Sequence, residues 1–308
     1  MIYTLTLNPA LDRELTVPDL LFDEVLRATA LRIDYGGKGF NVSRALAALG
    51  ADSVALGLVG GKTGEKLEAG LASLGIETDF TWVGEETRTN VSVVSEHEPH
   101  YLKVNESGPT VTGAEQAALM AKAEDLGRPG DWWVLAGSLP PGASETIYAD
   151  VIERLQATGA NAILDTSGLP LRYGCESGPF LVKPNAHEAS DLTGVPVDTV
   201  EAACEAAESI HAMGVELVLI SMGKAGALLS DRETTWWGRP PEVQERNPVG
   251  AGDASVAGLV WALSQGLALP DVLRWSVASG AAAASLDGTA MGSQELVESL
   301  VDQVAIAS

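Results

Sequence analysis

The chain has 308 residues, of which 46% are apolar and 20% are charged. It can therefore bury the core of one large α/β domain or of two modest domains. The 42 acidic and 19 basic residues give a formal net charge of -23, which repels phosphate backbones and anionic lipid. This balance argues against a nucleic-acid-binding protein and against a membrane-surface protein.

The cysteines and the N-terminal residues indicate the cellular compartment in which the protein is expected. Cys175 and Cys204 offer neither a disulfide framework nor a zinc-ligand spacing, which fits a reducing environment. The first residues resemble a strand rather than a signal peptide, and no apolar run has the length of a membrane span. A cytoplasmic location is expected.

Strand-like and helix-like segments alternate along most of the chain. Short apolar strands are predicted at residues 2–7, 53–59, 132–136, 161–165, 180–183 and 217–221. Amphipathic helices are predicted at residues 40–49, 65–74, 145–158, 201–213 and 254–263. This alternation predicts an α/β fold, with a doubly wound, mainly parallel sheet and helices on both faces.

Two stretches interrupt the alternation. Residues 11–34 and 80–105 contain no good helix, and the second has strand-like runs at 89–95 and 100–104 around a polar turn at 96–99. We expect the two stretches to form a small β-sheet lid over the site. Residues 1–10, 35–79 and 106–308 would then form the main α/β domain. On local pattern alone, an ordinary hairpin is an equally good interpretation.

The strongest motif is Gly250-Ala-Gly-Asp253, which leads directly into a predicted helix. The small residues let backbone amides approach an anion, and the helix dipole favours negative charge at this place. An aspartate would repel such an anion unless it accepts a proton from an attacking hydroxyl. The alternative is that Asp253 only caps the helix.

Other polar or glycine-rich segments follow predicted strands or precede helices. In residues 35–41, Gly37 permits close backbone approach, Lys38 supplies charge, and Asn41 offers a donor and an acceptor. Segments 136–142, 183–188 and 221–226 each follow a strand, and ligands bind beyond the C-terminal strand ends of open parallel sheets. Asn185 and Glu188 could hold Mg²⁺ directly or through water, although each also fits a capping box.

Seven segments, taken in order, resemble the ribokinase-like (PfkB) carbohydrate kinases, and the resemblance runs essentially end to end. They are 6–12 (TLNPALD), 36–41 (GGKGFN), 86–90 (ETRTN), 103–109 (KVNESGP), 137–140 (GSLP), 183–185 (KPN) with Glu188, and 250–253 (GAGD). The subgroup that they resemble comprises 1-phosphofructokinase and tagatose-6-phosphate kinase.

The resemblance implies roles for individual residues. Asp253 would deprotonate the acceptor hydroxyl, while the amides of Gly250, Ala251 and Gly252 would stabilise charge on the phosphoryl group in transfer. Sugar hydroxyls and nearby groups would be held by Asp12, Gly37, Lys38 and Asn41. The substrate's phosphate would be neutralised by Lys38, Arg88, Lys103 and Ser138. Mg-ATP would be positioned by Lys183, Asn185 and Glu188, with Mg²⁺ at Asn185 and Glu188, and the nucleotide would be lined by Ser221, Gly223 and Gly226.

The resemblance also implies ATP and Mg²⁺ as cofactors, a sugar phosphate as substrate and a homodimer formed through the lid. Segments 88–90 and 103–109 look closer to 1-phosphofructokinase, which favours phosphorylation of fructose 1-phosphate at O6 to fructose 1,6-bisphosphate. Tagatose 6-phosphate, phosphorylated at O1, is the first alternative, and fructose 6-phosphate is the second. A non-catalytic sugar-phosphate sensor is the alternative outside enzymes, and the presence of Asp253 argues against it.

One position departs from the family pattern. Many members have Asp-Thr where this chain has Asn247-Pro248, and those positions can contribute to a monovalent-cation site. Activation by potassium therefore does not follow from the resemblance.

Overall fold

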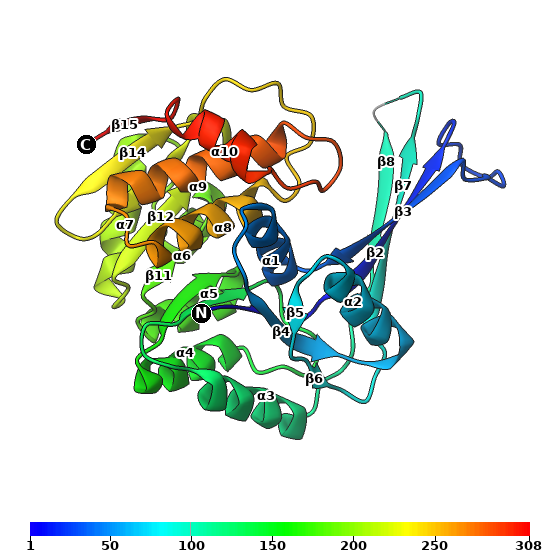
Figure 1. Ribbon diagram of the computed structural model, residues 1–308, viewed down its shortest axis with the longest axis horizontal. Helices are drawn as coiled ribbons and strands as arrows, with labels where there is room; N and C mark the ends of the chain where they lie inside the picture. Colours follow the sequence, from blue (N-terminus) through cyan, green and yellow to red (C-terminus); the bar gives the residue numbers. More distant parts are fainter. Residues whose placement is uncertain (99) are drawn as a thin grey trace.

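The computed structural model describes residues 1–98 and 100–308, so Pro99 of the predicted turn lies outside the described residues. Two sheets organise the chain (Figure 1). The large sheet has the strand order β15-β14-β13-β12-β11-β10-β9-β1-β4-β5, with β6 paired to β4, and the small sheet has the order β3-β2-β7-β8. The mixed α/β class agrees with the predicted alternation.

The large sheet is parallel from β5 through β12 and antiparallel from β12 through β15. Its strands are β1 (Ile2–Thr6), β4 (Val54–Val59), β5 (Glu77–Thr78), β6 (Thr81–Trp82), β9 (Trp132–Ala136), β10 (Asn161–Asp165), β11 (Leu181–Val182), β12 (Leu217–Ser221), β13 (Ala227–Ser230), β14 (Thr235–Arg239) and β15 (Ala305–Ala307). The six predicted strands match β1, β4, β9, β10, β11 and β12 to within one residue at each end. The antiparallel edge was not predicted.

Helices cover both faces of this sheet. They are α1 (Lys38–Ala48), α2 (Gly61–Ser73), α3 (Gly113–Leu126), α4 (Ile147–Thr158), α5 (Gly168–Glu176), α6 (Ala186–Thr193), α7 (Val200–Ala212), α8 (Ala251–Ser264), α9 (Leu269–Ala284) and α10 (Gln294–Val301), with a 3-10 turn, η1, at Gly223–Ala225. The described part of the chain contains no helix long and apolar enough to cross a membrane.

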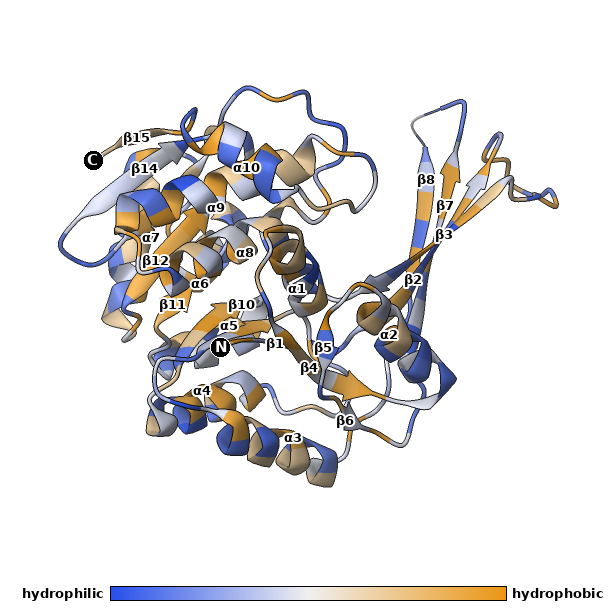
Figure 2. Ribbon diagram, viewed as in Figure 1, coloured by the Kyte–Doolittle hydropathy of each residue, from blue (hydrophilic) through white to orange (hydrophobic). Residues whose placement is uncertain are grey.

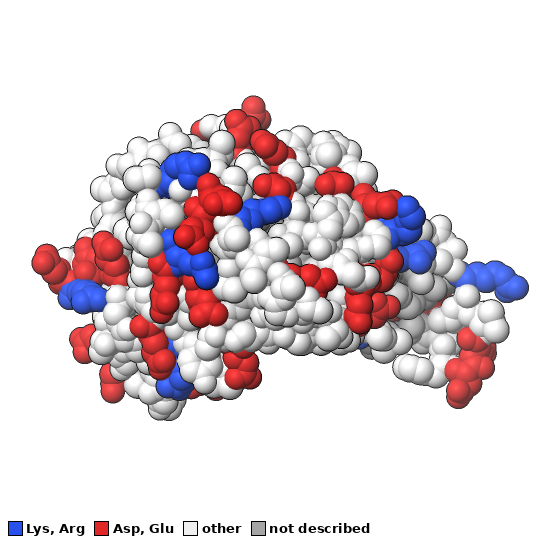
Figure 3. Space-filling view, turned by 90° about the horizontal axis from the view of Figure 1, so that it is seen from below, with Lys and Arg blue, Asp and Glu red and all other residues white. Residues whose placement is uncertain are grey.

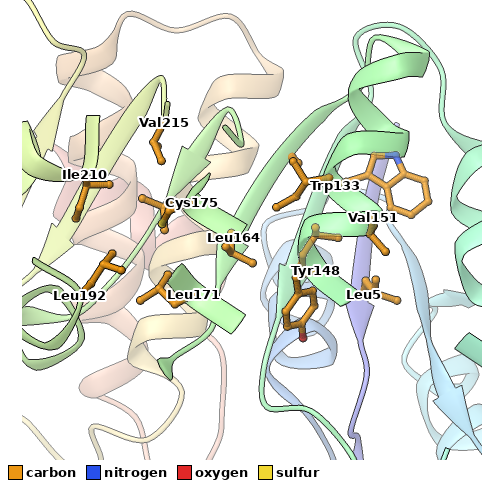
Figure 4. Close-up of a cluster of buried hydrophobic side chains, with 14 of the residues drawn as sticks. Leu5, Trp133, Tyr148, Val151, Leu164, Leu171, Cys175, Leu192, Ile210 and Val215 are labelled. Atoms are coloured by element: carbon orange, nitrogen blue, oxygen red, sulfur yellow. The ribbon is translucent and has the colours of Figure 1, made fainter. Parts of the chain in front are cut away.

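Two hydrophobic layers form because successive side chains of a strand point to opposite faces. In β9, Trp133 and Leu135 join the layer beneath α3 to α7, whereas Val134 and Ala136 join the layer beneath α1, α8, α9 and α10. Figure 4 shows part of the first layer, in which Trp133 and Tyr148 lie near Leu5. Strands buried on both faces explain the continuous apolar runs in the sequence.

The small sheet projects from the body beside α2 (Figure 1). It consists of β2 (Ala10–Val17), β3 (Ala30–Gly36), β7 (Arg88–Ser95) and β8 (Tyr101–Asn105). Its last two strands match the predicted runs 89–95 and 100–104 to within one residue at each end. Within the stretch 80–105, β6 pairs with β4, so residues 81 and 82 belong to the large sheet rather than to the small one.

Helices α8 and α9 approach closely at Gly258. A Cβ atom at this position would overlap the hydroxyl of Ser279 and the carbonyl oxygen of Trp275. We expect Gly258→Ala to lower the free energy of unfolding by about 1–3 kcal/mol because of overpacking, although alanine favours helix more than glycine does. Urea denaturation of both proteins measures the difference.

Gly113→Ala is the matched control, because Gly113 is also helical and a Cβ there would meet nothing within 4 Å. Its stability should stay equal or rise slightly. Equal stability of the two variants would contradict tight packing at Gly258.

Candidate active site

Polar residues follow the parallel strands at one edge of the large sheet. Asn8 follows β1, Gly137 and Ser138 follow β9, Asp165 ends β10, Lys183 follows β11, and Ser221 ends β12. The N-terminus of α8 lies at the same edge, since a Cβ atom at Gly252 would lie 3.9 Å from Lys183 Nζ. The predicted convergence of loops at this edge is therefore present.

Asp253 lies in the first turn of α8, 8% exposed. Gly250 precedes the helix in the left-handed conformation, with φ 86° and ψ -8°, which glycine adopts without steric cost. The carboxylate accepts a hydrogen bond at Oδ2 from Asn41 Nδ2, at 2.7 Å. Within the described chain α8 has no side-chain cap, so the alternative that Asp253 serves as the N-cap is wrong.

The amides at the start of α8 differ in what they contact. The Ala251 amide donates to the carbonyl oxygen of Pro248 at 3.2 Å. The amides of Gly250 and Gly252 have no acceptor among the described residues. Unsatisfied donors at a helix N-terminus, together with the helix dipole, make this turn suitable for an anion.

Asp165 holds two lysines next to Asp253. Its Oδ1 accepts a hydrogen bond from Lys38 Nζ at 2.9 Å, and its Oδ2 lies 3.4 Å from Lys183 Nζ. Burial opposes ionisation of Asp165, but Lys183 and Lys38 outweigh it and hold the pKa of this carboxyl below its ordinary value. Burial lowers the pKa of Lys38, but the Asp165 carboxylate has the larger effect in the opposite direction, so the pKa of Lys38 lies above its ordinary value. The pair is ionised, and Lys38 remains cationic at neutral pH.

The electrostatics around Asp253 differ from those around Asp165. Burial, reinforced by the charge of Asp165, raises the pKa of Asp253 to about 6. The hydrogen bond from Asn41 and the charges of Lys38 and Lys183 act in the opposite direction. A carboxylate with its pKa near the working pH is well suited to accept a proton.

The polar face of the small sheet carries three of the predicted residues. Strand alternation and pairing place Asp12, Arg88 and Lys103 on one face together with Asn90. Asn90 Nδ2 donates to Asp12 Oδ1 at 2.7 Å, and burial raises the pKa of Asp12. Charges on this face therefore gather around a half-buried carboxylate.

Arg88 is anchored by backbone oxygens. Its Nη2 donates to the carbonyl of Asn8 at 2.9 Å and its Nη1 to that of Glu106 at 3.0 Å. Nε is buried and has no partner among the described residues. Since neither of its hydrogen bonds goes to a carboxylate, the guanidinium keeps its charge available for an anion.

A cleft of about 1090 Å³ lies beside the N-terminus of α8. Predicted residues that line it are Asn185, Ser221, Gly223, Gly226, Ala251 and Gly252. The far wall was not predicted and comes from α9 (Ser276, Val277, Gly280, Ala281 and Ala284) and from the loop between Pro240 and Pro248. The lining is largely apolar, which suits a planar base, and it includes Ala251 and Gly252 at the N-terminus of α8.

Asn185 and Glu188 form a capping box for α6. Asn185 Oδ1 accepts from the Glu188 amide at 2.9 Å, and Glu188 Oε2 accepts from the Asn185 amide at 2.9 Å. The described residues contain no group of three or more His, Cys, Asp or Glu side chains that could hold a metal. With one Glu188 oxygen left over, this donor set fits Mg²⁺ that arrives with phosphates and retains water, not an all-protein cage.

The side chain of Asn247 bridges two loops. Nδ2 donates to the carbonyl of Gly288 at 2.7 Å, and Oδ1 accepts from the Val249 amide at 3.0 Å. Both polar atoms of the Asn247 side chain are therefore engaged by the backbone, and the position offers an amide where many family members have a carboxylate.

Sequence reasoning also missed Asp165 and Arg44, which contact predicted site residues. Asp165 could have been found, because it is an acid at the C-terminal end of a predicted buried strand. Arg44 lies one helical turn after Asn41 and donates to Asn41 Oδ1 at 3.3 Å. It lies within the predicted helix 40–49, and no motif in the sequence singles it out.

Comparison with known proteins gives a consistent result. Residues 6–296 match the sequence-family model described as pfkB family carbohydrate kinase. A 1-phosphofructokinase of Bacillus subtilis is 36% identical over 306 residues, covering 99% of each chain. A 1-phosphofructokinase of Xanthomonas campestris is 38% identical over 264 residues, covering 84% of this chain and 83% of the relative.

Among solved structures, phosphofructokinase-2 from Escherichia coli in complex with potassium superposes with a TM-score of 0.93 at 32% identity, covering 98% of each chain. The sequence similarity and the structural similarity both extend over nearly the whole length of the chain. This chain belongs to the pfkB family of carbohydrate kinases.

Proposed function

We propose that this protein transfers the γ-phosphoryl group of ATP to the O6 hydroxyl of fructose 1-phosphate, which gives fructose 1,6-bisphosphate and ADP. The observation that carries the proposal is Asp253, a buried carboxylate in the first turn of α8 with its pKa raised to about 6. A base beside unsatisfied helix amides is the arrangement that phosphoryl transfer to a hydroxyl requires.

In this reaction, one group of the site accepts the proton and other groups stabilise the negative charge. Asp253 Oδ2 is occupied by Asn41, which leaves Oδ1 to accept the hydroxyl proton as the oxygen attacks the γ-phosphorus. Amides of Gly250 and Gly252, with the nearby Lys183 ammonium, stabilise charge on the transferring group. The Ala251 amide is already donated to the Pro248 carbonyl oxygen, and Ala251 lines the cleft.

The sugar phosphate is proposed to lie between the strand ends and the polar face of the small sheet. Arg88, Lys103, Lys38 and Ser138 would bind its phosphate, and Asp12, Asn41 and the Gly37 backbone its hydroxyls. Acidic residues are spread over the surface seen in Figure 3, with basic residues scattered among them. A local cluster of cations is therefore needed to hold an anionic substrate against the overall charge.

ATP is proposed to occupy the cleft, with its base against Ser221, Gly223 and Gly226 and its phosphates towards Lys183. Mg²⁺ would reach Asn185 and Glu188 chiefly through water, and it would neutralise charge on the β- and γ-phosphates.

The choice of substrate within the family rests on the names of the relatives. Fructose 1-phosphate is favoured because the two relatives described above carry the name 1-phosphofructokinase. Tagatose 6-phosphate and fructose 6-phosphate are the alternatives, since these substrates differ in which end of the ketose carries the phosphate. A non-catalytic sensor is disfavoured by family membership and by the position of Asp253.

An assay of ADP release with Mg-ATP tests the proposal against fructose 1-phosphate, tagatose 6-phosphate, fructose 6-phosphate and fructose. The expected result is a kcat/KM for fructose 1-phosphate at least tenfold above the others, since every 1.4 kcal/mol of selective binding is tenfold. A preference for either 6-phosphate would refute the choice of substrate, and no turnover with any of them would refute the proposed reaction.

Activity should depend on the ionisation of Asp253. Because only the carboxylate accepts a proton, kcat should be full above pH 7 and fall about tenfold per pH unit below the pKa of about 6. Asp253→Asn should lower kcat by about 10²–10⁴-fold or more while ATP still binds. A flat profile from pH 5 to 8, or a loss under tenfold in the variant, would remove Asp253 as the base.

We propose that the protein forms a homodimer through the lid, and the second face of the small sheet supports this proposal. Strand pairing aligns Leu31, Leu15, Val93 and Leu102 in one row across the four strands, on the face opposite Asp12. Leu31, Ile33, Leu102 and Val104 are 44–57% exposed, and Figure 2 shows orange segments along these strands. Arg13 pairs with Ile33 on the same face, which is therefore mainly apolar, and exposed apolar surface of this kind is typical of an interaction site.

Charges placed in this face should separate the copies. Ile33→Glu combined with Leu102→Glu is expected to convert a dimer into a monomer, because carboxylates would be buried without partners. Light scattering after size-exclusion chromatography measures the mass. Leu74→Glu is the control, since Leu74 is 48% exposed at the end of α2 and outside the small sheet. A monomeric wild type, or an unchanged dimer in the double variant, would contradict a dimer through the lid.

A further inference from the structure

Arg44 occupies a half-buried position between three parts of the chain. It lies on α1, one turn after Asn41, and its side chain is 15% exposed. Nη1 donates to Asn41 Oδ1 at 3.3 Å. Nη2 donates to the carbonyl of Thr289 at 3.2 Å and lies 3.8 Å from Asp34 Oδ1 on β3 of the small sheet.

The orientation of the Asn41 amide decides what it offers to Asp253. With Nδ2 towards the carboxylate it donates a hydrogen bond, and with the amide reversed its oxygen would face a negative charge. A guanidinium has donors and no acceptor, so only Oδ1 of Asn41 can face Arg44. The contact with Arg44 therefore selects the orientation in which Nδ2 reaches Asp253 Oδ2.

The anchors of Arg44 are themselves fixed. Besides this ion pair with Arg44, Asp34 accepts a hydrogen bond at Oδ2 from Arg32 Nε at 2.9 Å, and Arg32 also pairs with Glu14 on β2. Thr289 belongs to the loop between α9 and α10, whose Gly288 carbonyl is bound by Asn247 just before the Gly250 turn. The planar fork of an arginine can reach all three groups at once, which one ammonium cannot.

We propose that Arg44 is a positioning residue, which holds the Asn41 amide so that the proton-accepting oxygen of Asp253 stays aimed at the acceptor hydroxyl, and which ties this geometry to the small sheet through Asp34. A base oriented by a second residue, itself oriented by a third, is the general plan of an activated catalytic group. The role assigned to Asp253 here rests on the proposed function.

Arg44→Met keeps an unbranched apolar stem and removes the guanidinium with its charge and donors. We expect kcat to fall about 10- to 100-fold, because small misplacements of a reacting group have effects of this size. Titration of Asp253 by ¹³C-carboxyl NMR should show a higher pKa than in the wild type, and the acid limb of the kcat profile should move to higher pH. Asp165, Lys38 and Lys183 also face Asp253 and are unchanged in this variant.

Three further variants separate positioning from charge and from stability. Arg44→Lys restores the charge without the fork, and its kcat should stay nearer to that of Arg44→Met than to the wild type. Asn41→Ala should lower kcat in the wild type but add less than threefold in the Arg44→Met background, since both changes break one chain of contacts. Arg274→Met, which removes a half-buried helical arginine paired with Asp271 on α9, should leave kcat and the Asp253 titration unchanged.

Full recovery by Arg44→Lys, or additive losses in the Asn41→Ala double variant, would overturn the proposal. A lower melting temperature with unaltered kcat and an unaltered Asp253 titration would overturn it as well, because a purely structural tie predicts that pattern. Lack of turnover by the wild type would instead overturn the proposed function, whereas the NMR titration still reports on Arg44.

Discussion

The carboxylate of Asp165 lies at the C-terminal end of β10, and the geometry of the site depends on it. It binds Lys38 at the start of α1 and lies beside Lys183 after β11, so it joins segments on both sides of its own strand. Burying the Asp165 carboxylate without a cationic partner would cost several kcal/mol of folding free energy. The two lysines therefore stabilise the Asp165 carboxylate, and the carboxylate in turn holds the two lysines in the site. Its negative charge also helps to keep the pKa of Asp253 near neutrality.

Asp165 and Asp253 thus have different pKa values although they lie in the same site. Asp165 is paired with two cations and remains ionised, while Asp253 is buried beside a like charge and titrates near pH 6. In many active sites, two carboxyl groups take different acid–base roles because their environments give them different pKa values. The same cations also counter the strongly acidic surface of the protein at the place where anionic ligands are proposed to bind.

The small sheet combines two surfaces through strand alternation alone. Its polar face carries Asp12, Asn90 and Lys103, and its other face carries the row that includes Leu31 and Leu102. Near the body the apolar face is covered, since Tyr35 packs over Gly70 of α2. Beyond α2 the face is open, and the contact of Arg44 with Asp34 links this projecting element to the base.

The sequence by itself determined the strands that converge on the site, the glycine-rich turn before Asp253 and the family, because these depend on local periodicity and on short motifs. It allowed both a capping box and a metal role at Asn185 and Glu188; the structure shows the capping box, formed within one helical turn, and one Glu188 oxygen remains for the proposed contact with Mg²⁺. Only the tertiary structure decided the contacts of Lys38 with Asp165 and of Asn41 with Asp253, whose partners are 127 and 212 positions apart. Such pairs form through sheet order and helix packing, which no local pattern encodes.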